Sequence, residues 1–217
     1  VPIDDLIGSI KAADINNALP RHRHQIQHHV LRPVCDGGEV DELTGLILRG
    51  TFSNPMDLPE GAIAIPLMWV YLAKANDDGS GLFARMRARL TVMGNRQKRE
   101  VTKFEAYSPV AHPVSFKILL IIHMGDPNVK IKVFDVGQAF LSSEQTRAVY
   151  VRHPPGYKLV EGKHSLYFLK LAPGEKPQRT VMRLLLALYG GVECSRLYWQ
   201  AFVGWHIQYG FQTTHYD

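Results

Sequence analysis

The chain has 217 residues, 46% of them hydrophobic, which is enough for a sizeable core in one large domain or two small ones. This composition excludes an intrinsically disordered chain. The 25 Lys and Arg against 20 Asp and Glu give a net charge of +5, which fits a phosphate-rich partner as well as an ordinary basic surface. No run of about 18 apolar residues is present, so we expect no membrane span.

The two cysteines, Cys35 and Cys194, lie far apart and without the spacing of metal ligands. This pattern favours free, buried thiols over a disulfide, because disulfides persist mainly in oxidising compartments. We therefore expect an intracellular protein, cytoplasmic or nuclear, with an organelle left open.

Residues 1–40 are predicted to form an N-terminal arm or linker, with weak helical spacing that Pro20 interrupts. Within it, the stretch 21–29 carries six potentially cationic groups, two arginines and four histidines. Such a stretch can contact phosphate, hold a metal through its histidines, or remain a solvated polar segment. The sequence leaves these three readings open.

The second predicted region, 41–112, is organised around a β-hairpin. A short helix is expected over 41–48, and two apolar or alternating strands are expected within 67–93, joined by a turn-forming cluster at 76–81. On the second strand Arg85, Arg87 and Arg89 recur at period two and so share one face. Three guanidinium groups in a row can bind phosphates, and the alternative is a solvated strand face.

The third predicted region, 113–217, begins with an apolar helix over 115–124 and continues into a buried strand that ends at Asp135. A carboxylate at the end of an apolar strand can bind a divalent metal. A second hairpin is expected to pair 165–172 with 180–186, and a largely buried helix is expected over 195–209.

Five blocks of the sequence, in the order found here, resemble the reverse transcriptase of copia-type retrotransposons over roughly residues 40–217. They are Met68-Trp69-Val70-Tyr71 with Asp78-Gly79 and Arg87-Ala88-Arg89-Leu90; Tyr107-Ser108-Pro109-Val110-Ala111; Asp135-Val136-Gly137-Gln138-Ala139-Phe140-Leu141; Val149-Tyr150-Val151 with Pro154-Pro155-Gly156-Tyr157; and Leu188-Tyr189-Gly190 with Arg196 and Tyr198-Trp199. The last block could also be aligned on residues 166–173, but the position of Gly210-Phe211 favours 188–199.

The resemblance implies an α+β fold: the fingers and palm of a right-hand polymerase, with an antiparallel sheet backed by helices. It implies an RNA or DNA template-primer as partner. Asp135 would be the catalytic carboxylate and would bind Mg²⁺ together with the backbone carbonyl of Val136. Phe140 would lie beneath the nucleotide sugar, and Arg87 and Arg89 would face the triphosphate or template. Tyr189 and Gly190 would lie along the templating base, and Arg85 would extend the basic row.

The sequence departs from this family's pattern in one block, where Val192, Glu193 and Ser195 replace its lysine, glutamine and proline. The Tyr-x-Asp-Asp hairpin, which carries two further carboxylates in the family, is expected beyond residue 217. We therefore expect an incomplete palm, with Mg²⁺ as cofactor if the chain is active and none otherwise. As it stands, the chain is expected to be inactive.

Three functional hypotheses follow. The first is a fingers and palm segment of a copia-type reverse transcriptase. The second is a domesticated, non-catalytic structural or RNA-associated subunit of a larger assembly, with protein partners covering the open palm edge. The third is an unrelated α+β binding domain.

Overall fold

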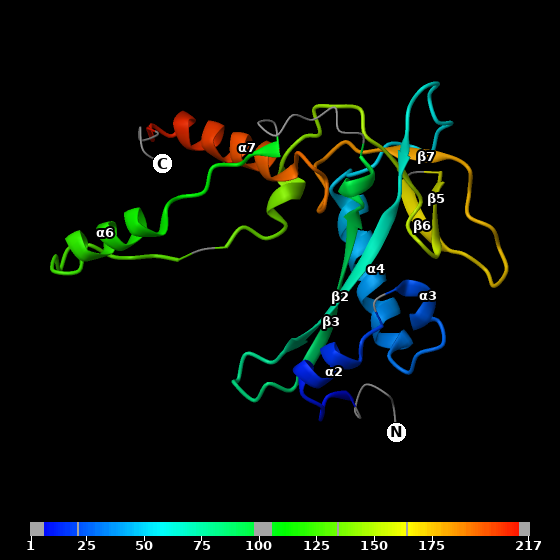
Figure 1. Ribbon diagram of the computed structural model, residues 1–217, viewed down its shortest axis with the longest axis horizontal. Helices are drawn as coiled ribbons and strands as arrows, with labels where there is room; N and C mark the ends of the chain where they lie inside the picture. Colours follow the sequence, from blue (N-terminus) through cyan, green and yellow to red (C-terminus); the bar gives the residue numbers. More distant parts are fainter. Residues whose placement is uncertain (1–6, 21, 98–105, 134, 164, 213–217) are drawn as a thin grey trace.

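The computed structural model describes residues 7–20, 22–97, 106–133, 135–163 and 165–212, and it has an α+β architecture (Figure 1). The described strands form three small sheets. One antiparallel sheet backed by helices was expected. Instead, helix α4 packs along a long hairpin, and the two smaller sheets lie beside one end of this pair. The elements discussed below are α2 (Ala12–Ala18), α3 (Arg23–Ile26), α4 (Arg32–Leu48), α6 (Pro113–His123), η2 (Ala139–Ser142) and α7 (Cys194–Gln208).

The predicted hairpin within 67–93 is confirmed. Strand β2 (Leu67–Ala75) pairs antiparallel with β3 (Phe83–Val92). Burial alternates along β3, with Met86, Ala88 and Leu90 buried between less buried neighbours. This is the pattern expected of a strand with one face on the core and the other toward solvent.

The two strands of the predicted second hairpin both form, but they pair with other strands and not with each other. Strand β6 (Leu166–Lys170) pairs with β5 (Tyr157–Glu161). Strand β7 (Val181–Arg183) pairs antiparallel with β4 (Tyr150–Arg152), which in turn pairs in parallel with β1 (Ala64–Ile65). The expected pairing of 165–172 with 180–186 was therefore wrong. Each strand pairs with an earlier segment of the chain. The local sequence specifies that a segment forms a strand more strongly than it specifies which strand pairs with it.

The residues expected as an N-terminal arm pack against the hairpin. The side-chain amide of Asn16 on α2 accepts from the backbone N–H of Ala73 at 2.7 Å and donates to its carbonyl oxygen at 3.1 Å. Ile15 and Ile26 are buried in a cluster with Ala73 and Met86 of the hairpin. The helix expected at 41–48 begins nine residues earlier, so α4 runs across the expected boundary at residue 40.

The main core lies between α4, the hairpin and the two smaller sheets. Leu46, Leu90, Met182 and Leu188 are fully buried there. Trp69 anchors the hairpin to a neighbouring segment, because its indole N–H donates to the carbonyl oxygen of Pro155 at 3.1 Å. Both cysteines are free and buried, as expected.

Helix α6 confirms the predicted apolar helix, but it does not back a sheet. Figure 1 shows it standing away from the rest of the molecule, and none of its residues is buried. Helix α7 also confirms an expected helix, yet only Cys194 and Leu197 of it are buried, so the expectation of a largely buried helix was wrong. Among the described residues, no helix has the length and apolarity needed to cross a membrane.

The strand expected to end at Asp135 is absent from the described part of this segment. Residues 131–133 and 135–136 are irregular and exposed, with Val133 95% exposed. An apolar alternating pattern becomes a strand only where a neighbouring strand pairs with it. The described sheets lie elsewhere, and the segment instead connects α6 to the body of the molecule.

Candidate nucleic-acid interface

The arginine row on β3 has the arrangement that its period predicts. Arg85, Arg87 and Arg89 lie opposite Lys74, Leu72 and Val70 in the hairpin register. They alternate with the buried residues of β3 and therefore share its other face. Arg85 is exposed near the hairpin turn, whereas Arg87 and Arg89 are partly buried farther along the strand. The row thus has an open end and a packed end.

At the packed end, Arg89 stacks on an aromatic ring. Its guanidinium carbon lies 5.2 Å from the centroid of the Tyr189 ring, within the range of a cation–π contact. The Nε of Arg89 is buried, and the described part of the chain gives it no hydrogen-bond partner. Stacking fixes the plane of the guanidinium, so the group is presented in one orientation.

A carboxylate on α4 lies beside this arginine pair. Glu42 accepts a hydrogen bond from the backbone N–H of Leu90 at 3.3 Å. Burial raises the pKa of Glu42, opposed by that hydrogen bond and by the charges of Arg87 and Arg89. Burial also raises the pKa of the Tyr189 phenol, which therefore remains a hydrogen-bond donor at neutral pH. One carboxylate on α4 thus faces two guanidinium groups, those of Arg87 and Arg89.

Phe140 joins the same cluster from a distant part of the chain. Its ring meets that of Tyr189 edge-on, with centroids 5.5 Å apart, and that of Tyr198 at 6.1 Å. The turn before it is set by Gln138, whose φ of 55° is left-handed and whose side-chain oxygen accepts from Arg49 Nε at 2.6 Å. The chain thereby places a second aromatic ring against Tyr189, the ring on which Arg89 stacks.

Gly190 occupies a position that only glycine fits. Its φ is +83°, and a Cβ there would lie 2.3 Å from the carbonyl oxygen of Val92. Next to it, the backbone N–H of Val92 donates to the carbonyl oxygen of Tyr189 at 2.7 Å. The turn at 188–190 is therefore held against the end of β3, which keeps Tyr189 over Arg89.

Glu193, expected to place a negative charge in this block, is engaged in other contacts. It is 6% exposed, and its Oε1 pairs with Arg147 Nε at 3.0 Å. Its Oε2 accepts from Gln145 Nε2 at 3.3 Å. The negative charge that Glu193 brings to this block is thus compensated by Arg147 and Gln145.

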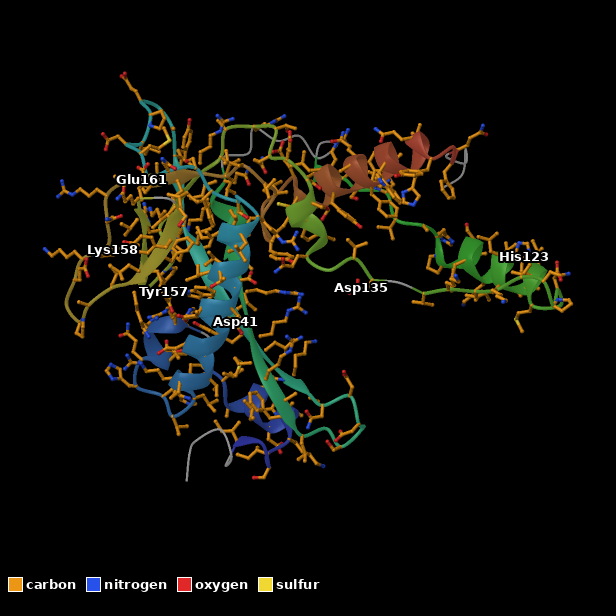
Figure 2. All side chains as sticks on the ribbon, turned by 180° about the vertical axis from the view of Figure 1, so that it is seen from behind. Asp41, His123, Asp135, Tyr157, Lys158 and Glu161 are labelled. Carbon is orange, nitrogen blue, oxygen red and sulfur yellow. The ribbon has the colours of Figure 1, made fainter. Side chains whose placement is uncertain are left out.

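The expected metal ligand is separate from this cluster. Figure 2 shows Asp135 on the extended connection between α6 and the body of the molecule. The described residues contain no group of three His, Cys, Asp or Glu side chains arranged to hold a metal ion. One exposed carboxylate with the neighbouring carbonyl of Val136 does not fit a two-metal site, which needs several converging oxygen ligands.

The sequence predicted five members of the cluster and missed three. Arg87, Arg89, Phe140, Tyr189 and Gly190 come together in space, whereas Arg85, Asp135 and Val136 lie outside. Glu42, Arg49 and Tyr198 were not anticipated as members. Only long-range contacts from α4, from the residue that follows it and from α7 bring them in, and no local spacing signals such contacts. Of the stretch 21–29, the residues 22–29 are described and contribute to no metal cluster.

Comparisons with known proteins bear on the same residues. A family model described as reverse transcriptase (RNA-dependent DNA polymerase) matches residues 52–200. The chain is 31% identical over 140 residues to the retrovirus-related Pol polyprotein from transposon TNT 1-94 of Nicotiana tabacum. This matched region covers 61% of this chain and 10% of that protein. It is 32% identical over 122 residues to the corresponding polyprotein from transposon RE1 of Arabidopsis thaliana, covering 53% of this chain and 8% of that protein.

These matches confirm the resemblance to copia-type retrotransposon proteins that the ordered blocks indicated. The chain spans a tenth or less of the length of these curated relatives. No solved structure matches it.

Proposed function

The chain belongs to the reverse transcriptase (RNA-dependent DNA polymerase) family, and we propose that its Arg87–Arg89 face binds the phosphates and bases of a template-primer. One observation carries this proposal: Arg89, which shares a strand face with Arg87, stacks on Tyr189, and Phe140 from a separate segment packs against that ring. Guanidinium groups recognise phosphates, and aromatic rings stack with bases of any sequence. In this arrangement the hairpin corresponds to polymerase fingers.

Binding to a labelled single-stranded RNA, measured by fluorescence anisotropy over a range of salt concentrations, tests this proposal. Because each phosphate contact on a single strand contributes about 0.7 to the slope of log affinity against log salt, replacing Arg87 and Arg89 by alanine should lower the slope by about 1.4. Arg152→Ala, an exposed arginine on β4, is the matched control and should leave the slope unchanged. Equal slopes for the double variant and the wild type would contradict the proposal.

For catalysis, we propose that the described fold is insufficient. Asp135 and Val136 do not complete a Mg²⁺ site, and further carboxylates would have to reach Asp135 from outside the described residues. In a primer-extension assay with Mg²⁺, the 217-residue chain should yield no product. Extension that disappears in Asp135→Asn would show that a working metal site is present and would overturn this part of the proposal.

A second candidate function is a structural or RNA-associated subunit, and exposed apolar surface favours it. Helix α6 is apolar apart from Ser115, Lys117 and His123, and most of its apolar side chains are exposed, with Ile121 72% and Met124 beyond its end 77% exposed. Apolar surface of this extent marks a protein interface, whether with the remainder of a palm or with a separate partner. Sedimentation of the chain tests this: self-association or partner binding that is abolished by Ile121→Glu supports it, and a monomer unaffected by the substitution contradicts it.

A further inference from the structure

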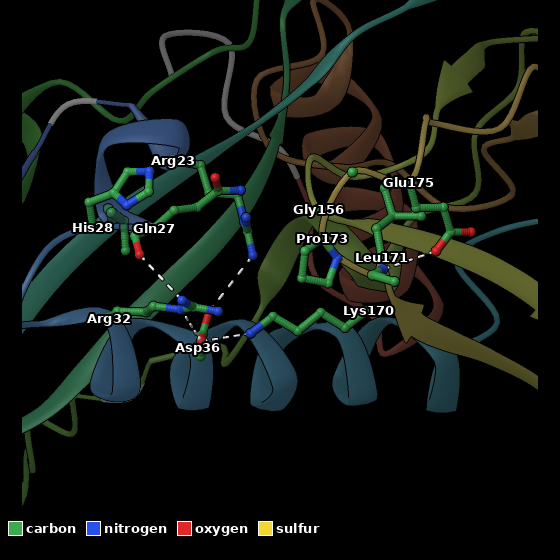
Figure 3. A pocket seen from close by; sticks show the side chains of 13 residues that line it. Arg23, Gln27, His28, Arg32, Asp36, Gly156, Lys170, Leu171, Pro173 and Glu175 are labelled. Carbon is green, nitrogen blue, oxygen red and sulfur yellow. Dashed lines mark hydrogen bonds and ion pairs between the residues drawn. The ribbon is translucent and has the colours of Figure 1, made fainter.

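A second charged site lies beside the first turns of α4, in a pocket of about 640 Å³. Figure 3 shows its walls: the segment from α3 to the start of α4, the turn at Gly156, and the loop that follows β6. We call it the Arg23 pocket. Its volume lies within the range of about 300–1,000 Å³ that holds small ligands and cofactors.

Three cations of the Arg23 pocket converge on one carboxylate. Asp36 lies 2.6 Å from the Nζ of Lys170, 3.4 Å from the Nε of Arg32 and 3.8 Å from a terminal nitrogen of Arg23 (Figure 3). A guanidinium carries five N–H donors and an ammonium three, so one carboxylate leaves many donors available. His28 lines the same pocket and adds a further ring nitrogen.

Arg23 is held in place before any ligand arrives. Its side chain is only 10% exposed, and its Nε and one terminal nitrogen donate to the fully buried carboxylate of Glu39 at 3.0 and 3.1 Å. Its guanidinium lies flat against Gly156, where a Cβ would come within 2.4 Å of the guanidinium carbon. The hydroxyl of Tyr71 also donates to Glu39. This buried support fixes the guanidinium in the pocket wall.

Glu39 neutralises Arg23, which leaves Arg32 and Lys170 to share Asp36 with one positive charge in excess. Both of these side chains are partly exposed, at 51% and 42%, and so remain accessible to a ligand. Glu175, in the loop that follows β6, adds little net charge to the pocket, because its carboxylate pairs with Lys158 at 2.5 Å. The electrostatics of the pocket therefore favour an anion with several acceptor oxygens.

We propose that the Arg23 pocket binds the phosphate groups of a small phosphorylated ligand of nucleotide size. Phosphate oxygens accept from guanidinium forks and from ammonium groups together, which is the donor set present here. The pocket does not include Arg87, Arg89 or Tyr189, so it is a site separate from the hairpin face. Binding here is independent of the function proposed above.

Calorimetric titration of the 217-residue chain with sodium tripolyphosphate tests the proposal. Charge-assisted hydrogen bonds are strong enough that Lys170→Met and Arg32→Met should each weaken binding by about tenfold. Lys176→Met is the matched control, because this exposed lysine lies in the same loop after β6 but does not line the pocket. This variant should bind tripolyphosphate as tightly as the wild type does. Circular dichroism checks that each variant is folded.

A parallel titration with a single-stranded oligonucleotide separates the two phosphate sources. The proposal expects Lys170→Met to leave oligonucleotide affinity unchanged while tripolyphosphate affinity falls. Absence of tripolyphosphate binding, or equal affinity in Lys170→Met and Lys176→Met, would overturn it. A matching loss of oligonucleotide affinity in Lys170→Met would assign the pocket to a polynucleotide and would also overturn it.

Discussion

Replacing Gly190 by alanine tests whether the turn at 188–190 is fixed against β3. Two costs add. A left-handed φ of +83° costs a non-glycine residue about 1–2 kcal/mol. In addition, the new Cβ would lie 2.3 Å from the carbonyl oxygen of Val92. The backbone must then separate, which places the neighbouring hydrogen bond from the Val92 N–H to the Tyr189 carbonyl at risk.

Losing a buried backbone hydrogen bond adds about 1–3 kcal/mol, so we expect a total loss of about 2–5 kcal/mol in the free energy of unfolding. Gly174→Ala is the matched control, because Gly174 has a similar φ of +80° with nothing within 4 Å of the added Cβ. It should cost only the conformational part, about 1–2 kcal/mol.

Urea unfolding followed by circular dichroism measures both variants. With a denaturant slope of about 2 kcal/mol per molar urea, the midpoint of Gly190→Ala should fall by about 1–2.5 M, and that of Gly174→Ala by less than about 1 M. Equal shifts for the two variants would refute the argument from close packing. It would mean that the turn moves freely and does not hold Tyr189 over Arg89.

Three further predictions follow from buried polar groups and from α6. Burial lowers the pKa of His153, whose Nδ1 accepts from the backbone N–H of Leu159 at 3.0 Å, so the unfolded chain takes up the proton first. Stability should be complete above about pH 6.5 and decline as pH falls through the lower folded pKa, and thermal melts of His153→Gln should show a flatter decline. Glu39→Gln leaves buried Arg23 with only the more distant Asp36, at 3.8 Å, as a charge partner and should cost about 3 kcal/mol in urea unfolding; a loss below about 1 kcal/mol would contradict this reading of the pair. At a concentration where the chain sediments as a monomer, Ile121→Glu should leave the melting temperature unchanged, because that side chain is 72% exposed, and a clear decrease would show that α6 packs intramolecularly.

The motifs of the sequence were sufficient to identify the family and the hairpin. Alternation along β3 placed Arg85, Arg87 and Arg89 on one face, because the side chains of a strand alternate whatever surrounds it. The apolar runs at 115–124 and 195–209 correctly indicated helices, which form as α6 and α7. These are local properties, determined by the backbone geometry and by residues close in the chain.

Tertiary structure alone decided which segments meet. The pattern before Asp135 looked like a buried strand, yet no described strand pairs with it and Val133 is almost fully exposed. By contrast, Tyr189 stacks on Arg89, and Phe140 contacts Tyr189, across long separations in the chain. Pairing and burial depend on partners distant in sequence, and local periodicity carries no information about them.

The sequence by itself thus determined the family of this protein and the chemical character of its hairpin face. The tertiary structure decided that the arginines and aromatic rings form one cluster while Asp135 stands apart from it. It also revealed the Arg23 pocket, whose cations come from α4, from β6 and from the segment expected as a linker. The physical reason is the same in each case: residue types set what a side chain can bind, and long-range packing sets which side chains act together.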